Sequence, residues 1–274
     1  MKLAEWLKLP EIRDIKDLDD PATAVLHNRI LRRKTFLKKL YEDFYKQFAE
    51  AIPQPDEKKL VELGSGRGFI KEVIPNAMTS DILRIAGADM VFSATDMPFE
   101  DESVDAFFMF DVLHHIIEPR RFLSEAQRCL KPSGRVVMIE PANTPLARFF
   151  YRNFHHERFD VQGGWQVDPC QKLAGAGKGG PLTQANGALP WIIFVRDRII
   201  FEQEYPRLKV VSIRNHTPFR YLLSGGFTLR QLVPGFLYPL VKAIEYLLTP
   251  ANNRLGMFMT VILEKTKGNK PAMK

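Results

Sequence analysis

The stretch VELGSGRGF, from Val61 to Phe69, decides the fold. A short apolar run leads into it, and three glycines then alternate with other residues before the helix-like segment FIKEVIP. Glycines let the backbone turn tightly and approach a ligand closely, and the N-terminus of a following helix offers free N–H groups. This stretch therefore predicts a strand, a ligand-binding turn and a short helix at the edge of an α/β sheet.

The segments on both sides of this turn alternate between strand and helix patterns. Further strands are predicted at NAMTSDI, MVFSATDMPF, SVDAFFMFDVL, GRVVMIEPAN, LKVVSIRNH and GMFMTVILEKT, with helices at PRRFLSEAQRCLKPSG and near LPWIIFVRDRIIFEQEY. Nearly continuous apolar runs such as SVDAFFMFDVL are typical of strands buried on both faces. Before the turn, one helix is predicted from about Pro21, ended by Pro53 and Pro55. The pattern favours a doubly wound, mostly parallel sheet of seven strands.

Acidic residues around the turn indicate which ligand it binds. The dinucleotide fingerprint needs a small residue five positions after the first glycine, where this chain has Phe69. Glu62, just before the turn, would repel a pyrophosphate and suits a cationic ligand. Asp81, Asp96 and Asp111 follow the next three predicted strands, so they are expected at the same carboxyl edge of the sheet. Each acid alone would suit a helix cap or a turn, whereas the ordered set favours a ligand site.

Two longer phrases carry a family resemblance. ATDMPFEDESVDAFFMFDVLHHI and FLSEAQRCLKPSGRVVMIEP match the third- and fourth-strand motifs, and the approach to the fifth strand, of the class I S-adenosylmethionine-dependent methyltransferases, and the stretch resembles a methyltransferase type 11-like core. The resemblance spans about Lys58 to Asn143 and implies a Rossmann-like sheet that binds S-adenosyl-L-methionine. The segment between Asp81 and Asp96 is shorter than in most members.

The resemblance also implies a set of cofactor-binding residues. They are Glu62, Gly64, Ser65, Gly66 and Gly68 at the methionine moiety and turn, Asp81 at the ribose with Ile82 on the adenine, Asp96 and Met97 at the adenine amine, and Phe110 and Asp111 at the methyl end. The chain then divides into a helical N-terminal lid (1–55), an S-adenosylmethionine-binding core (56–145), a substrate-side insertion (146–206) and the last strands with an apolar, basic helical insertion (207–274).

Histidines are the candidates for a catalytic base, because an oxygen nucleophile must lose a proton during methyl transfer. His155 and His156 are followed by Glu157, which would orient an imidazole, and His115 follows the fourth strand in DVLHHI. The alternative for each is a structural polar cluster. Without a third dispersed ligand evident beside two histidines and a carboxylate, no metal site is predicted. The loop from Gly175 to Gly180 is either a lid or a surface loop.

Charge and hydropathy are uneven along the chain. The net charge is +7, and eleven Lys and Arg from Arg207 onward face only Glu245 and Glu264. The apolar stretch from Tyr221 to Leu248 is too interrupted by prolines and charges to span a bilayer. It favours a cap over the substrate pocket, with a dimer contact or a helix at an anionic membrane surface as alternatives. The absence of a signal-type apolar run at the N-terminus and the presence of only two cysteines lead us to expect a cytoplasmic, possibly membrane-peripheral protein with reduced thiols.

The sequence thus predicts a methyltransferase that acts on a small-molecule, lipid-linked or saccharide-type acceptor. Two other classes stay open at this stage: a non-catalytic cofactor-binding or regulatory protein of the same fold, and a nicotinamide-dependent oxidoreductase. Nucleic acid is an unlikely partner, because no recognition module is visible. The sequence predicts neither the acceptor atom nor the oligomeric state.

Overall fold

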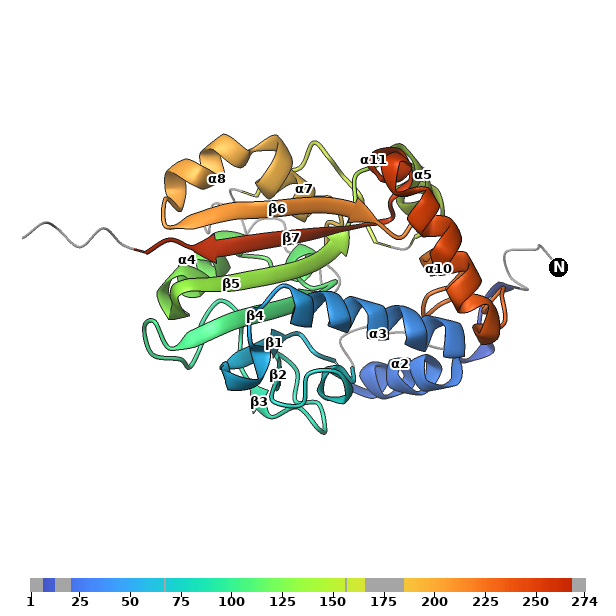
Figure 1. The fold of residues 1–274 in the computed structure, drawn as a ribbon, viewed down its shortest axis with the longest axis horizontal. Helices are drawn as coiled ribbons and strands as arrows, with labels where there is room; N and C mark the ends of the chain where they lie inside the picture. The colour runs from blue at the N-terminus through green and yellow to red at the C-terminus, as the bar shows by residue number, and fades with distance from the viewer. Residues whose placement is uncertain (1–6, 13–20, 67, 156, 166–184, 268–274) are drawn as a thin grey trace, which may run out of the picture.

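The computed structural model describes residues 7–12, 21–66, 68–155, 157–165 and 185–267. Its core is one seven-stranded sheet with the order β3-β2-β1-β4-β5-β7-β6 (Figure 1). The strands are β1 Leu60–Leu63, β2 Met78–Asp81, β3 Met90–Val91, β4 Val104–Phe110, β5 Leu130–Pro141, β6 Leu208–His216 and β7 Phe258–Lys265. The first five run parallel, and β7 is antiparallel to both β5 and β6. The predicted fold class, a doubly wound and mostly parallel Rossmann-like sheet, is confirmed.

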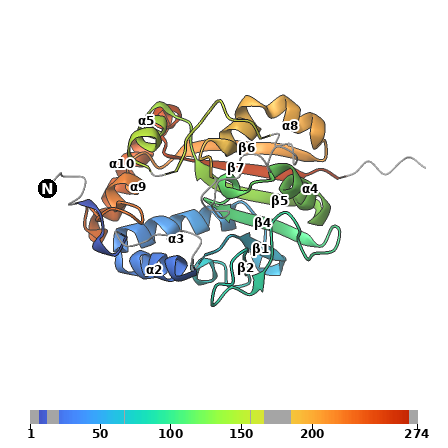
Figure 2. The ribbon, with the colours of Figure 1, turned by 180° about the vertical axis from the view of Figure 1, so that it is seen from behind.

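Helices cover both faces of the central strands. Helix α3, Thr35–Glu50, lies on one face, and its Phe48 stacks on Phe108 of β4 with ring centroids 5.0 Å apart. The preceding residue of β4, Phe107, points to the opposite face, because successive side chains of a strand alternate, and its ring centroid lies 6.1 Å from that of Phe99 there. Helix α4, Pro119–Cys129, buries its apolar stripe against the sheet (Figure 2). Burial on both faces explains the continuous apolar run of β4.

The single N-terminal helix predicted from the sequence is wrong: two helices form, α2 Pro21–Arg33 and α3. Lys34 separates them with a non-helical backbone conformation (φ −86°, ψ 89°). Its buried ammonium donates to the carbonyl oxygens of Gly226 and Leu229, the latter at 2.8 Å. Contacts with a loop far along the chain therefore fix the break.

The connections around β2 are short. The segment FIKEVIP forms only a 3₁₀ turn, Ile70–Glu72, where a helix was predicted. Residues 82–89, between β2 and β3, contain no helix. This half of the sheet is therefore held mainly by strand pairing and by α3.

The remaining helices follow β5 and interrupt the pair β6–β7. They are α5 Pro145–Phe154, α7 Leu189–Trp191, continued by a π-helical turn, α8 Arg198–Glu204, α9 Arg220–Ser224, α10 Tyr238–Leu247 and α11 Asn252–Leu255. Helices α5, α10 and α11 gather at one end of the molecule, where α9 also packs against α3 (Figures 1 and 2). Among the described residues, no helix is long and apolar enough to cross a membrane.

Candidate functional site

The glycine turn follows β1 with two residues in left-handed conformations, Gly64 (φ +63°) and Gly66 (φ +53°). A Cβ on Gly64 would lie 2.7 Å from a methyl carbon of Val112, so only glycine fits there. A Cβ on Gly66 would meet nothing within 4 Å, so this side of the turn is open. The Gly66 N–H donates to Asp81 Oδ2 at 2.9 Å, and the Ser65 N–H donates to the carbonyl oxygen of Ser80 at 2.9 Å. The turn is thus tied to the end of β2.

Glu62 lies beneath this turn as a buried carboxyl group. Burial raises its pKa to about 8, an effect that a hydrogen bond from the Tyr45 hydroxyl opposes and the nearby charge of Asp81 reinforces. Its Oε2 has no hydrogen-bond partner among the described residues. A buried carboxylate oxygen without a partner costs free energy unless it gains a donor or a positive charge. Glu62 therefore suits a cationic ligand.

The other predicted cofactor residues are placed as follows. Asp81, at the end of β2, accepts from the backbone N–H groups of Gly66 and Leu83, each at 2.9 Å, and burial raises its pKa. Ile82 is half exposed beside it, and Asp96 is exposed on a tight turn after β3. Met97 is buried, and its N–H donates to Glu125 Oε2 at 2.9 Å. Asp81 therefore contacts the glycine turn directly, whereas Asp96 lies on a separate turn.

Aromatic side chains of α3 cover the end of β4. Phe110 meets Tyr41 edge-on, with ring centroids 4.6 Å apart, and lies 5.0 Å from the ring of Phe44. Tyr45, one helical turn after Tyr41, contacts Phe69 of the glycine segment at 5.2 Å. The sequence reasoning did not identify these two tyrosines. Their spacing of four residues on a predicted amphipathic helix was the available signal.

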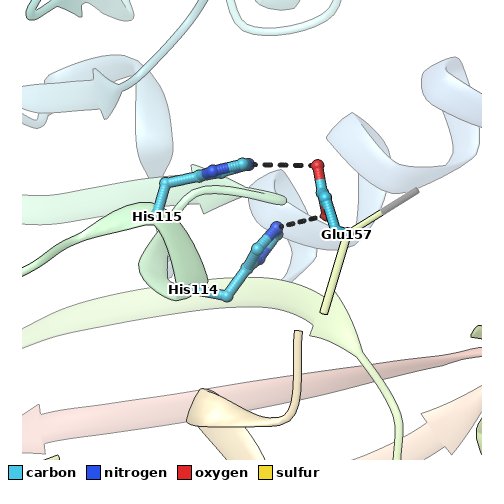
Figure 3. Close-up of side chains that lie close together, drawn as sticks. All are labelled: His114, His115 and Glu157. Atoms are coloured by element: carbon cyan, nitrogen blue, oxygen red, sulfur yellow. Dashed lines mark ion pairs between the residues drawn. The ribbon is translucent and has the colours of Figure 1, made fainter. Parts of the chain in front are cut away.

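An acid–imidazole cluster follows β4 and β5. We define it as Asp111, His114, His115, Glu140 and Glu157. His114 Nδ1 lies 2.7 Å from Glu140 Oε2, and His114 Nε2 lies 3.3 Å from Glu157 Oε2. His115 Nε2 lies 3.8 Å from Glu157 Oε1. Figure 3 shows both imidazoles, which come from one short turn, directed at the two oxygens of Glu157.

Glu140 and His114 hold this cluster together. Glu140 Oε1 accepts from the N–H groups of Val112 and Leu113 at 3.0 and 2.6 Å, so it fixes the turn that carries the histidines. Burial would lower the pKa of His114, but the hydrogen bond to Glu140 and the nearby carboxyl group of Glu157 raise it well above the usual value. Burial would raise the pKa of Glu157, but His114 and the other nearby imidazoles lower it to about 2. The imidazole of His114 therefore lies between two carboxyl groups, and its raised pKa favours its protonated form.

Asp111 is one of two members of this cluster, with Glu157, that line a cavity. It adopts a left-handed conformation (φ +59°) that is uncommon for residues other than glycine. Such strain concentrates at functional sites. Burial of the site raises the pKa of Asp111, the charge of His114 opposes this rise, and the charges of Glu157 and Glu140 reinforce it. A carboxyl group with a raised pKa is suited to accept a proton near neutral pH.

The cavity itself is small, with a volume of about 10 Å³, room for about one water molecule. Its lining includes Asp111, Tyr151, His155, Glu157, Tyr221 and Phe258. An acceptor larger than water therefore requires these elements to move apart. The tyrosines come from α5 and α9, a combination that no local sequence pattern indicates.

The predicted catalytic histidines have different positions. His155 lines the cavity, and its Nδ1 accepts from the Glu157 N–H at 3.3 Å and lies 3.7 Å from Glu157 Oε2. His115 contacts the same carboxylate. The structure therefore brings His115 and His155 together around Glu157. His156 and the loop from Gly175 to Gly180 lie outside the described residues.

The cluster also contains groups that can ligate a metal. The ligand atoms of His114, His115 and Glu157 lie within 4.8 Å of one another, as do those of Asp111, His114 and Glu140. Imidazole and carboxylate are ordinary zinc ligands. Both nitrogens of His114 already face carboxyl oxygens, and its raised pKa favours a proton on this imidazole.

Comparison with known proteins gives partial but specific matches. Residues 61–138 match the family model described as a methyltransferase domain. A demethylmenaquinone methyltransferase of Clavibacter sepedonicus is 43% identical over 67 residues, which cover 23% of this chain and 27% of that protein. A demethylmenaquinone methyltransferase of Thermotoga maritima is 29% identical over 117 residues, which cover 36% of this chain and 51% of that protein. The chain thus spans between about a quarter and about half the length of these two relatives.

Among solved structures, a geranyl diphosphate C-methyltransferase from Streptomyces coelicolor A3(2) aligns with a TM-score of 0.47 and 15% identity. The alignment covers 85% of this chain and 82% of that one. The assignment rests on the sequence match over 61–138, which contains the glycine turn, Asp81, Asp96 and the HisHis turn. The sequence match therefore confirms a methyltransferase domain over residues 61–138, as the resemblance to the class I S-adenosylmethionine-dependent methyltransferases predicts.

Proposed function

We propose that the protein transfers the methyl group of S-adenosylmethionine to an ionisable atom of a small amphipathic acceptor. The observation that carries this proposal is the cavity at the carboxyl ends of β4 and β5. Aromatic rings and tyrosines form part of its wall, and Asp111, Glu157 and Arg158 provide its charged groups. The relatives named as demethylmenaquinone methyltransferases support an acceptor with an apolar body, of which demethylmenaquinone is an example.

The glycine turn fits this cofactor. The buried Glu62 oxygen without a partner suits the cationic amino acid end, and the open side of Gly66 gives room for close approach. We propose that Glu62 and the turn residues Gly64, Ser65, Gly66 and Gly68 hold this end, that Asp81, Ile82, Asp96 and Met97 hold the nucleoside, and that Phe110 and Asp111 adjoin the methyl group. When bound, the cofactor supplies an electrophilic methyl group on a sulfonium, so the protein mainly supplies position and electrostatics.

Asp111 is the proposed proton acceptor. It faces the cavity, its pKa is raised, and it would take the proton that leaves the acceptor oxygen or carbon as the new bond to the methyl carbon forms. Glu157 stays ionised and raises the proton affinity of Asp111 through its charge. His115 and His155 contact Glu157 and would act as positioning residues. The catalytic role predicted for them from the sequence remains a prediction.

Methyl-labelled S-adenosylmethionine tests this function. The protein is incubated with a cell extract and separately with demethylmenaquinone, and the products are separated into lipid, saccharide and small polar fractions. We expect label in the lipid fraction. Label in the saccharide fraction alone would overturn the acceptor class but keep the methyltransferase. Binding of S-adenosylhomocysteine without any transfer would show a non-catalytic protein of the same fold.

A further inference from the structure

Large apolar side chains are exposed at the end of the molecule that holds α5 and α10. We define the apolar end surface as Phe149, Phe154, Phe236, Leu240, Tyr246 and Leu247. Phe236, Tyr246 and Leu247 keep 76%, 80% and 78% of their surface exposed. Single exposed apolar residues are ordinary, but a group of this size marks an interaction site.

Among the described residues of α5 and of the segment from α9 to α11, the exposed charged side chains near this surface are basic. Helix α5 carries Arg148 and Arg152 and no acidic residue. On the segment from α9 to α11, Arg254 is exposed, and so is Lys242, which pairs with Asp43 at 2.8 Å, whereas Glu245 is buried in an ion pair with Arg220. The surface at this end therefore combines exposed basic side chains with exposed apolar ones. This combination complements an anionic bilayer, in which lipid headgroups attract the basic groups and the acyl boundary accepts the rings.

A buried polar network holds α9 and α10 against the rest of the protein. Arg220 of α9 donates to Glu245 of α10 and, at 2.7 Å, to Asp43 of α3. The Tyr238 hydroxyl donates to the same Asp43 oxygen at 2.6 Å. The exposed side chains of α10 are therefore presented by a helix that is firmly anchored through its other face.

Helices α5 and α9 also form walls of the cavity. Helix α5 directs the buried Tyr151 toward the cavity and exposes Phe149 and Phe154. Tyr221 of α9 lines the cavity as well, and α11, which follows α10, packs against α5. Helix α5 thus contributes side chains both to the apolar end surface and to the wall of the proposed acceptor site.

We propose that the apolar end surface docks on a bilayer with anionic headgroups, from which the acceptor enters the cavity between α5 and α9. The acceptor part of this inference rests on the proposed function. The docking part is independent of it, because vesicle binding requires no turnover.

Vesicle sedimentation tests the docking. The full chain is mixed with phosphatidylcholine vesicles that contain either no phosphatidylglycerol or about one third of it, at low and high salt. We expect binding to the anionic vesicles that weakens with salt. Phe236→Glu and Leu247→Glu should each weaken it by about tenfold or more, because both place a charge in the apolar face. Ile199→Glu is the matched control, since Ile199 is 72% exposed on α8, away from this end (Figure 1).

Three outcomes would overturn the docking proposal. They are no vesicle binding by the wild type, an equal loss in Ile199→Glu, and a dimer in light scattering that Phe236→Glu dissociates, which would assign the surface to a second copy. Methyl transfer to an acceptor in detergent separates the two proposals. Phe236→Glu should keep this transfer if docking alone is lost. Vesicle binding by a wild type that transfers no methyl group would keep the docking and overturn the function.

Discussion

The glycine turn after β1 and the acid–imidazole cluster after β4 lie at the same edge of the sheet, but they are built differently. The turn is made mostly of backbone, from residues within about twenty positions of one another, tied by N–H donors to β2. The cluster is made of side chains from the segment after β4, from the end of β5 and from the segment after α5. A backbone site depends on glycine conformation, whereas a side-chain site depends on protonation. Substitution and pH should therefore affect the two sites in distinct ways.

The largest expected effect is on the chemical step. Asp111→Asn should lower kcat by about 10²–10⁴-fold, the usual contribution of a general base. Asparagine tolerates the left-handed conformation of this position, so the fold and S-adenosylhomocysteine affinity should persist. The measurement is kcat with calorimetric Kd. His155→Gln should have a smaller effect if this residue only positions Glu157.

The pH profile gives a second readout of the same substitution. Because the pKa of Asp111 is raised, wild-type kcat should increase with pH toward neutrality as this carboxyl group ionises. Asp111→Asn should remove the increase. A profile that persists in Asp111→Asn and disappears in His155→Gln would assign the base to His155.

Two alanine substitutions in the glycine turn should distinguish the cost of left-handed backbone strain from the cost of steric overlap with a neighbouring side chain. Gly66→Ala places a left-handed alanine in open space and should cost about 1–2 kcal/mol of unfolding free energy, together with weaker cofactor binding. Gly64→Ala adds an overlap with Val112, and overpacking costs about 1–3 kcal/mol more. Urea unfolding and calorimetry measure the two effects. Equal stability of the variants would show that Val112 does not constrain the turn.

Cofactor binding should be linked to the protonation of Glu62. Its pKa of about 8 means that the free protein holds a proton there at pH 6.5, and a cationic ligand favours the ionised form. Binding should therefore release a proton, and affinity should rise by about tenfold per pH unit at most between pH 6 and pH 7.5. Calorimetry in buffers of different ionisation enthalpy counts the proton. Glu62→Gln should bind more weakly and without this pH dependence; the same dependence in that variant would assign the proton elsewhere.

The smallest expected effect is that of metal removal. The raised pKa of His114 favours a proton on the imidazole between Glu140 and Glu157, so we expect no divalent ion in the cluster. Dialysis against EDTA should leave kcat unchanged within about twofold. A loss of activity that Zn²⁺ or Mg²⁺ restores would show that His114, His115 and Glu157 ligate a metal.

The strands and the glycine turn could be predicted from sequence because both depend on neighbouring residues. Alternation of apolar runs with Gly64 and Gly66 was sufficient for them. The break between α2 and α3 could not be predicted from the sequence, because it depends on hydrogen bonds from Lys34 to the distant residues Gly226 and Leu229. The segment FIKEVIP has helical periodicity but too few residues before β2 for more than a 3₁₀ turn.

The candidate site also contains one part that the sequence predicts and another that depends on distant contacts. Asp81 follows from its position at the end of β2, and its contact with Gly66 agrees with the predicted neighbourhood. The pairing of His114 with both Glu140 and Glu157 brings together residues 26 and 43 positions apart, and no spacing rule for a helix or a strand relates them. The cavity wall from Tyr151 and Tyr221 likewise depends on how α5 and α9 pack.

The central claim is that the glycine turn after β1 binds S-adenosylmethionine. Calorimetric titration of the full chain with S-adenosylhomocysteine tests it most directly. We predict binding of one ligand per chain that Gly66→Ala and Glu62→Gln weaken, with no comparable binding of NAD. Tight binding of NAD by a protein that does not bind S-adenosylhomocysteine would contradict it.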